Sequence, residues 1–216
     1  VPLTEQPLIK LENSYYHQGL AGTQATLYTR KSVADRLSLL IEKLKPHYGL
    51  WIYDTYRSRT TQMALFNEFY TRLRAQHPQW SEQKLLAECC QYVSHPEHKN
   101  RYAIPFHLSG GAIDLALFSI ESGKVLDFGS DFDEFREHSH TAFYERGFDP
   151  NFGVSETEWL TYRDNRRLLF NVMRDTGFVN FRTEWWHYDL GTCNWGDALS
   201  LPYLYDEMLI PEKNIT

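Results

Sequence analysis

Apolar residues recur at intervals of three and four positions in four segments of the chain, the spacing that places them on one face of a helix. In the first segment the apolar positions are Val33, Leu37, Leu40, Ile41 and Leu44. Pro46 ends this segment, Ser81 can cap the third, and Gly177 suits the end of the fourth. The sequence therefore predicts helices over residues 32–44, 60–75, 82–92 and 158–176.

Shorter apolar runs between these segments predict strands. The runs cover residues 50–53, 112–118, 178–181 and 186–190, and a turn at 121–124 makes a hairpin with 125–128 plausible. Residues 1–29, 94–106 and 129–157 are expected to be irregular, and the last of these is long enough to be a functional loop.

The predicted helices cluster early in the chain and the short strands late. This order favours an α+β fold, with a central antiparallel sheet flanked by helices, over alternating βαβ units. The chain has 216 residues, of which 42% are hydrophobic, which is enough for one well-buried core. We therefore expect a single compact domain over residues 1–216.

Composition excludes several classes of protein. A net charge of −6 with no long basic run makes nucleic acid a poor partner. No apolar stretch approaches the ~20 residues that a membrane-spanning helix needs. The three cysteines are odd in number and form no CxxC, so neither a disulfide framework nor a thiolate zinc site is expected.

The segment from His107 to Asp114 has the residue types of a metal site. Asp114 interrupts an apolar, β-prone run, an unusual place for a carboxylate unless a cation receives it. Gly110 and Gly111 permit a tight bend, through which both side chains can point to one place. A mixed His/Asp set suits zinc better than calcium.

A second segment, Thr183 to His187, supplies another imidazole and a spare carboxylate. Glu184 and His187 would face opposite sides of a regular strand, so a bend or bulge at Trp185 is needed to bring both to one ion. With His187 as third ligand, Glu184 is free to act as general base and acid. Arg57, at the end of a predicted strand, is the best-placed fixed cation to stabilise a developing negative charge.

Each segment alone also has an ordinary interpretation. A lone histidine near a strand is usually a packing residue, and a lone aspartate can cap a turn or pair with an arginine. The two segments in this order, HxxGxAxD followed by ExWH, are more specific, and together they favour a metal site.

These motifs, with Tyr56-Arg57 upstream and Phe128–Asp133 between them, resemble the D-alanyl-D-alanine dipeptidases, a VanX-like family of zinc metallopeptidases. The resemblance implies a D-Ala-D-Ala metallopeptidase (hedgehog-like) fold and one Zn²⁺ per chain. It assigns zinc binding to His107, Asp114 and His187, the role of catalytic base and acid to Glu184, and transition-state stabilisation to Arg57.

The resemblance also places Asp133 where it would meet the free ammonium group of the substrate; a solvated acidic loop is the alternative interpretation. One position departs from the family pattern, because Pro105 stands where a serine is common. A hydroxyl contact to substrate is then lost or supplied by another group such as Ser109. The departure leaves strict preference for D-Ala-D-Ala open.

Other histidines are expected to be ordinary surface or hydrogen-bonding residues. His138 and His140 could suggest a second metal site, but no carboxylate motif of known spacing completes it. We interpret His95 and His98 in the same way. Of Trp185 and Trp186, one is expected to line the pocket and the other to belong to the core.

Three functions fit this sequence. The leading one is a zinc dipeptidase that hydrolyses D-Ala-D-Ala or a related short D-dipeptide, in cell-wall precursor turnover or glycopeptide resistance. A D,D- or L,D-carboxypeptidase acting on peptidoglycan stem peptides would need an open groove instead of a closed pocket. A non-catalytic zinc-binding module would not need Glu184. The expected setting is bacterial, cytoplasmic or periplasmic with the cytoplasm slightly favoured, and the sequence leaves the oligomeric state open.

Overall fold

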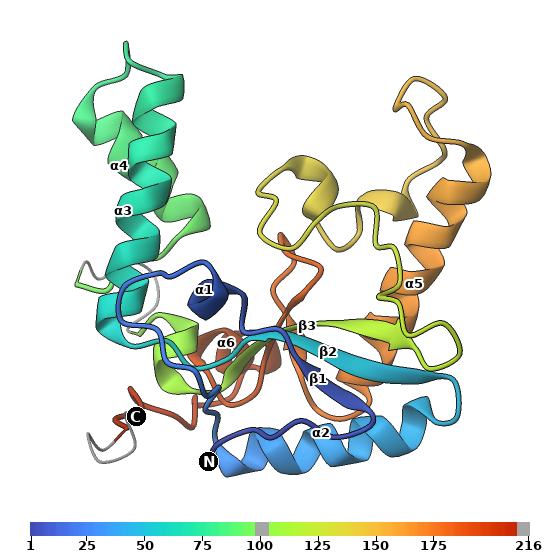
Figure 1. The fold of residues 1–216 in the computed structure, drawn as a ribbon. Helices are drawn as coiled ribbons and strands as arrows, with labels where there is room; N and C mark the ends of the chain where they lie inside the picture. Colours follow the sequence, from blue (N-terminus) through green and yellow to red (C-terminus); the bar gives the residue numbers. More distant parts are fainter. Residues whose placement is uncertain (98–103, 211–216) are drawn as a thin grey trace.

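The computed structural model describes residues 1–97 and 104–210, and within them the strands form one five-stranded sheet (Figure 1). The strand order is β1-β2-β3-β5-β4. Strands β2 (Tyr48–Asp54) and β3 (Ala112–Ser119) form its centre. The outer strands are β1 (Ile9–Leu11), β5 (His187–Asp189) and β4 (Val179–Asn180). Only the β1–β2 pair is parallel among these, and the other three pairs are antiparallel.

The main core lies between this sheet and two helices. Helix α2 (Lys31–Leu44) packs on β2 and on α5 (Glu156–Arg174). The apolar face predicted for α2 is buried as expected. A capping box between Ser155 and Glu158 starts α5, because each side chain bonds the other residue's backbone N–H. Strand β3 is buried along nearly its whole length, which explains its unbroken apolar run.

Helices α3 (Arg59–Gln76) and α4 (Glu82–Tyr92) form a hairpin that stands away from the sheet (Figure 1). Ser58 and Ser81 cap the two helices through their side-chain oxygens. The hairpin has a small core of its own, made of Phe66, Leu73, Leu85, Cys89 and Val93. It is therefore a separate layer beside the sheet.

The segment between β3 and α5 is largely irregular, as predicted, with two short 3₁₀ turns, η2 (Glu137–Ser139) and η3 (Phe143–Glu145). It packs on α5 through a third apolar cluster, made of Phe143, Tyr144, Trp159 and Tyr162. This segment arches between the α3–α4 hairpin and α5 (Figure 1).

The predicted fold class, α+β with a central antiparallel sheet flanked by helices, is confirmed, although β1 joins this sheet in parallel. All four predicted helices begin and end within two residues of their expected bounds. Three expectations were wrong. Residues 1–29 contain β1 and α1 (Ser14–His17), and α6 (Cys193–Leu199) was not predicted. The expected hairpin strand at 125–128 is reduced to one bridge between Phe118 and Val125. The missed elements are short, so their periodicity is too brief to detect. His98 lies outside the described residues, and no helix among those described is long and apolar enough to cross a membrane.

Candidate metal centre and active site

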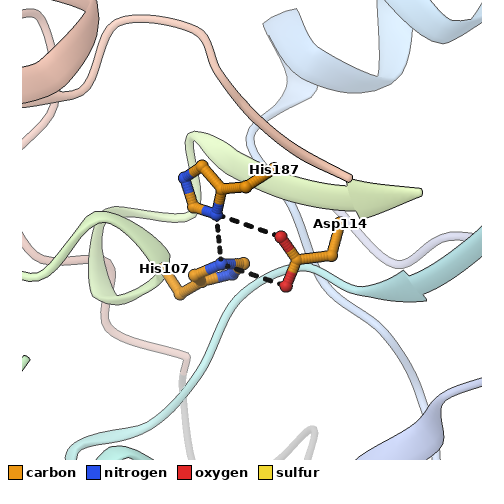
Figure 2. A group of neighbouring side chains, drawn as sticks. All are labelled: His107, Asp114 and His187. Carbon is orange, nitrogen blue, oxygen red and sulfur yellow. Dashed lines mark hydrogen bonds and ion pairs between the residues drawn. The ribbon is translucent and has the colours of Figure 1, made fainter. Parts of the chain in front are cut away.

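Three buried side chains from three different elements meet at one end of the sheet (Figure 2). His107 lies on η1 (Phe106–Ser109), Asp114 on β3, and His187 at the start of β5. Asp114 and His187 are direct cross-strand partners, so the sheet itself holds them side by side. Their exposed fractions are 5%, 1% and 3% for His107, Asp114 and His187.

The candidate ligand atoms lie close enough together to share one ion, since one from each residue lies within 4.8 Å of the others. His107 Nε2 lies 3.1 Å from His187 Nδ1 and 3.3 Å from Asp114 Oδ2, and His187 Nδ1 lies 3.0 Å from Asp114 Oδ1. Zinc–ligand bonds of 2.0–2.1 Å at tetrahedral angles separate neighbouring ligands by about 3.3 Å. Asp114 Oδ1 is buried and accepts no hydrogen bond from the residues that the structure describes. This donor set can therefore hold a metal ion, and it is the only such group among the residues that the structure describes.

Each histidine uses its other ring nitrogen for a contact that turns the ring towards this centre. His107 Nδ1 donates to the Thr55 carbonyl at 2.5 Å, and His187 Nε2 donates to Asp189 Oδ2 at 3.1 Å. Asn194 donates to the same Asp189 oxygen at 2.7 Å. Such outer contacts fix the tautomer and orientation of metal-binding histidines.

A bulge at the end of β2 places Asp54 opposite Asp114, so two buried carboxylates lie next to each other. Arg57 joins them: Nε donates to Asp54 at 2.6 Å, and Nη2 donates to Asp114 at 3.2 Å. Burial raises the pKa of Asp54. Burial also acts to raise the pKa of Asp114. The nearby His107 and His187 outweigh this effect and hold the pKa of Asp114 well below its usual range. Asp114 is therefore ionised, as a metal ligand must be.

Glu184 lies beside the metal group on a turn that leads into β5. Its Oε2 is 3.9 Å from His187 Nδ1, and its side chain is 13% exposed. This turn is closed by a hydrogen bond from His187 N–H to the Glu184 carbonyl. It brings Glu184 and His187 to the same side, as a bend or bulge at Trp185 was expected to do. Burial raises the pKa of Glu184 to about 8, with His187 opposing the shift. A carboxylate with a raised pKa can take up a proton and give it back near neutral pH.

Tyr15 connects Arg57 to Asp133. Its hydroxyl donates to Asp133 Oδ2 at 2.6 Å and lies 3.3 Å from Arg57 Nη2. Burial raises the pKa of Asp133 to about 7, although Arg57 acts to lower it. The half-buried Asp133 carboxyl is thus held at a defined place with a partner on one oxygen.

A cavity of about 380 Å³ opens onto this group. Its inner end is lined by His107, His187, Glu184, Arg57 and Asp133. Its outer wall comes from the α3–α4 hairpin, and Phe135 spans the gap: its ring centroid lies 5.4 Å from that of Phe69 and 5.7 Å from that of Tyr92. The structure thus brings the two predicted histidine ligands, Glu184, Arg57 and Asp133 to one cavity. Asp114 does not line this cavity but contacts both histidines.

Ser109 is the predicted site residue that the structure keeps away from this cavity. Its hydroxyl donates to the Phe106 carbonyl at 2.6 Å and accepts from Gly111 N–H at 3.0 Å, and the residue is 2% exposed. Ser109 therefore braces the bend before β3 and does not line the cavity. Pro105 does line the cavity.

Both tryptophans of the Glu184 segment belong to the main core, and neither lines the cavity, so the expectation that one would do so was wrong. His138 pairs with Glu134 at 3.2 Å, and it forms no metal group with His140 or any other described residue.

Sequence reasoning missed Tyr15, Asp54 and Asp189. Asp54 had the signal that singled out Asp114, a carboxylate in an apolar strand. Asp189 is two positions after His187 and therefore on the same face of the strand. Tyr15 had no signal, because nothing local separates it from the other 13 tyrosines.

Comparison with known proteins agrees with this geometry. The model of the D-ala-D-ala dipeptidase family, peptidase family M15, matches residues 17–201. The D-alanyl-D-alanine dipeptidase of Enterococcus faecium is 30% identical over 148 residues, which are 66% of this chain and 62% of that protein. Two proteins of the same name, from Escherichia coli K12 and Enterococcus faecalis, are 38% and 36% identical over 101 and 84 residues.

The two shorter alignments cover 47% and 39% of this chain, and 43% and 36% of those relatives. In all three cases, less than two thirds of the relative's length is matched. The family match, by contrast, extends from before β2 to beyond β5 and includes every residue of the metal group. The chain therefore belongs to the D-ala-D-ala dipeptidase family of zinc-dependent peptidases.

Proposed function

We propose that this protein is a zinc dipeptidase that hydrolyses D-Ala-D-Ala or a related short D-dipeptide, with one zinc ion held by His107, Asp114 and His187. The observation that carries the proposal is the approach of these three side chains to within 3.0–3.3 Å of one another, with Glu184 3.9 Å from His187. A bound zinc ion would supply Lewis acidity towards water and the peptide carbonyl.

The surrounding side chains have distinct roles in this proposal. Glu184 accepts a proton from the attacking water and delivers it to the leaving amine. Arg57 lines the cavity and stabilises negative charge on the carbonyl oxygen. Asp133 accepts the substrate's ammonium group, for which its free lone pairs and its place in the cavity are suited.

The outer end of the cavity favours a dipeptidase over a carboxypeptidase that acts on stem peptides. Phe135 lines the cavity and packs against Phe69 and Tyr92 of the hairpin, and we infer that this contact limits the length of the peptide that can bind. Asp133 at the inner end demands a free ammonium, which an acylated substrate lacks. A non-catalytic zinc-binding module would require neither Glu184 nor this ammonium site.

The biological role follows from the substrate. Its relatives are bacterial, and hydrolysis of D-Ala-D-Ala would remove a peptidoglycan building block, in precursor turnover or in glycopeptide resistance. Of the cytoplasm and the periplasm, the two compartments that fit the sequence, we slightly favour the cytoplasm for this reaction.

The test combines metal analysis with a panel of substrates. Purified protein is expected to contain one zinc per chain and to cleave free D-Ala-D-Ala in preference to its N-acetylated form. Activity should disappear with a chelator and return with zinc. Cleavage of the acetylated peptide alone would reverse the order of the two peptidase functions, and a protein that never takes up metal would contradict both.

A further inference from the structure

Arg166 is a buried arginine without an acidic partner. It lies on α5 and is 3% exposed, and no carboxylate of the described residues lies within ion-pair distance of it. Its guanidinium instead donates to three backbone carbonyls: Nε to Phe128 at 2.8 Å, Nη2 to His138 at 2.8 Å, and Nη1 to His140 at 2.7 Å. These three carbonyls belong to the segment between β3 and α5.

An interior charge of this kind is costly unless its hydrogen bonds are made. The carbonyl dipoles compensate for it, and the planar fork of the guanidinium requires them at set positions. Arg166 therefore defines the relative placement of residues that lie ten or more positions apart in an otherwise irregular segment. A lysine at this position would keep the charge but could not reproduce the fork.

The three carbonyl contacts of Arg166 form a clamp on this segment. In sequence, Asp133 lies between the residues that the clamp joins. Phe128 is bound on one side of it and His138 on the other. Asp133 has a φ of 62°, in the left-handed region that residues other than glycine adopt only when their surroundings require it. The buried Ser139 tightens the same segment, because its hydroxyl contacts Ser130 and the Glu134 carbonyl. The closed loop thus holds the Asp133 carboxylate in place.

We propose that Arg166 is a positioning residue for substrate recognition: by clamping the loop at Phe128, His138 and His140, it holds Asp133 where the substrate's ammonium group binds. This inference rests on the proposed function, in which Asp133 receives that ammonium. Arg166 itself touches no substrate, since it does not line the cavity.

The test measures recognition of the ammonium group separately from hydrolysis. The ratio of kcat/KM for D-Ala-D-Ala to kcat/KM for its desamino analogue, N-propanoyl-D-alanine, reports the ammonium contact and cancels changes in zinc or Glu184. We expect Arg166→Lys to lower this ratio at least ~10-fold with zinc content unchanged. In an Asp133→Asn background, Arg166→Lys should leave the ratio at the value measured for Asp133→Asn alone.

Arg167→Lys is the matched control. Arg167 is the next residue on α5, but it is 49% exposed and pairs with Glu145, so its ratio should equal that of the unaltered protein. Equal losses for both substrates in Arg166→Lys, or additive effects with Asp133→Asn, would overturn the inference. If Arg166→Lys does not fold, Arg166→Gln, which also lacks the guanidinium fork, decides in its place: a lowered ratio supports the clamp, and an unchanged ratio overturns it.

Failure of the proposed function would show at an earlier step. It would appear as no hydrolysis of D-Ala-D-Ala by the unaltered protein, or as an unchanged ratio in Asp133→Asn alone. Either result removes the ammonium site and the Arg166 role with it. A lowered ratio in Asp133→Asn with an unchanged ratio in Arg166→Lys rejects only the clamp.

Discussion

The two ends of the cavity are built in different ways. At the inner end, the three candidate metal-binding side chains come from the sheet and its adjoining turn, are at most 5% exposed, and are held by contacts to Thr55, Asp189 and Arg57. At the outer end, the wall belongs to the α3–α4 hairpin, whose small core is separate from the main one. Phe135 is packed against both cores.

In the proposed function, this difference separates the reaction at the inner end from substrate selection at the outer end. Metal chemistry needs ligand atoms at fixed distances, which a sheet core provides. Selection by size needs a wall that can differ between proteins without disturbing the ligands, and a hairpin with its own core provides that. Substitutions at the inner end should therefore affect zinc and turnover, whereas those at the outer end should affect selectivity and local stability.

The largest effect is expected at a ligand. His187→Ala should reduce zinc content and bring activity to the level of the chelated protein, a loss greater than the ~10²–10⁴-fold that a general base contributes. Metal analysis beside activity measures this. Full zinc occupancy in His187→Ala would exclude His187 as a ligand.

The next effect separates the base from the ligands. Glu184→Gln keeps the shape of the side chain but cannot accept a proton, so kcat should fall at least ~10²-fold while zinc content stays at one per chain. Steady-state kinetics and metal analysis on the same sample check this. Unchanged turnover would assign the proton transfer elsewhere and would favour the non-catalytic module.

A smaller effect is expected from pH at Asp133. Burial raises the pKa of this carboxyl to about 7, so the free enzyme loses the negative charge as pH falls through that value. The ratio of kcat/KM for D-Ala-D-Ala to that for its desamino analogue should therefore decrease as pH falls, approaching about tenfold per pH unit below 7. Asp133→Asn should make the ratio independent of pH between 6 and 7, below the pKa of the substrate's ammonium group. A pH dependence that persists in this variant would point to another group.

The smallest effect on the chemistry should come from the hairpin core. Leu85→Ala, at a position 2% exposed in α4, should destabilise the hairpin by about 2–5 kcal/mol and raise KM without loss of zinc. Hydrogen exchange of α3 and α4, with zinc content as a second readout, would measure this. Leu115→Ala in β3 is the control, because the same truncation beside Asp114 should weaken zinc retention. Zinc loss of equal size in both variants would mean that the two ends are not independent.

Local patterns were sufficient for much of the architecture. The four helices and both central strands follow from the spacing of apolar residues and from helix-ending residues such as Pro46 and Gly177. Both signals lie within a few residues of the element that they define. The short elements β1 and α6 were missed because their periodicity is too brief, and β1 also depends on a partner about 40 positions away. The hairpin expected at 125–128 is reduced to one bridge to Phe118.

The sequence by itself determined the candidates for the metal group, because histidine and carboxylate at unusual places in apolar segments restrict the possible chemistry. Only the tertiary structure decided that His107, Asp114 and His187 meet, since strand register joins residues 73 positions apart. It also placed Ser109 against the backbone and brought Tyr15, Asp54 and Asp189 around the site. Residue type is a local property of the chain, whereas a distance between side chains is set by the packing of the whole core.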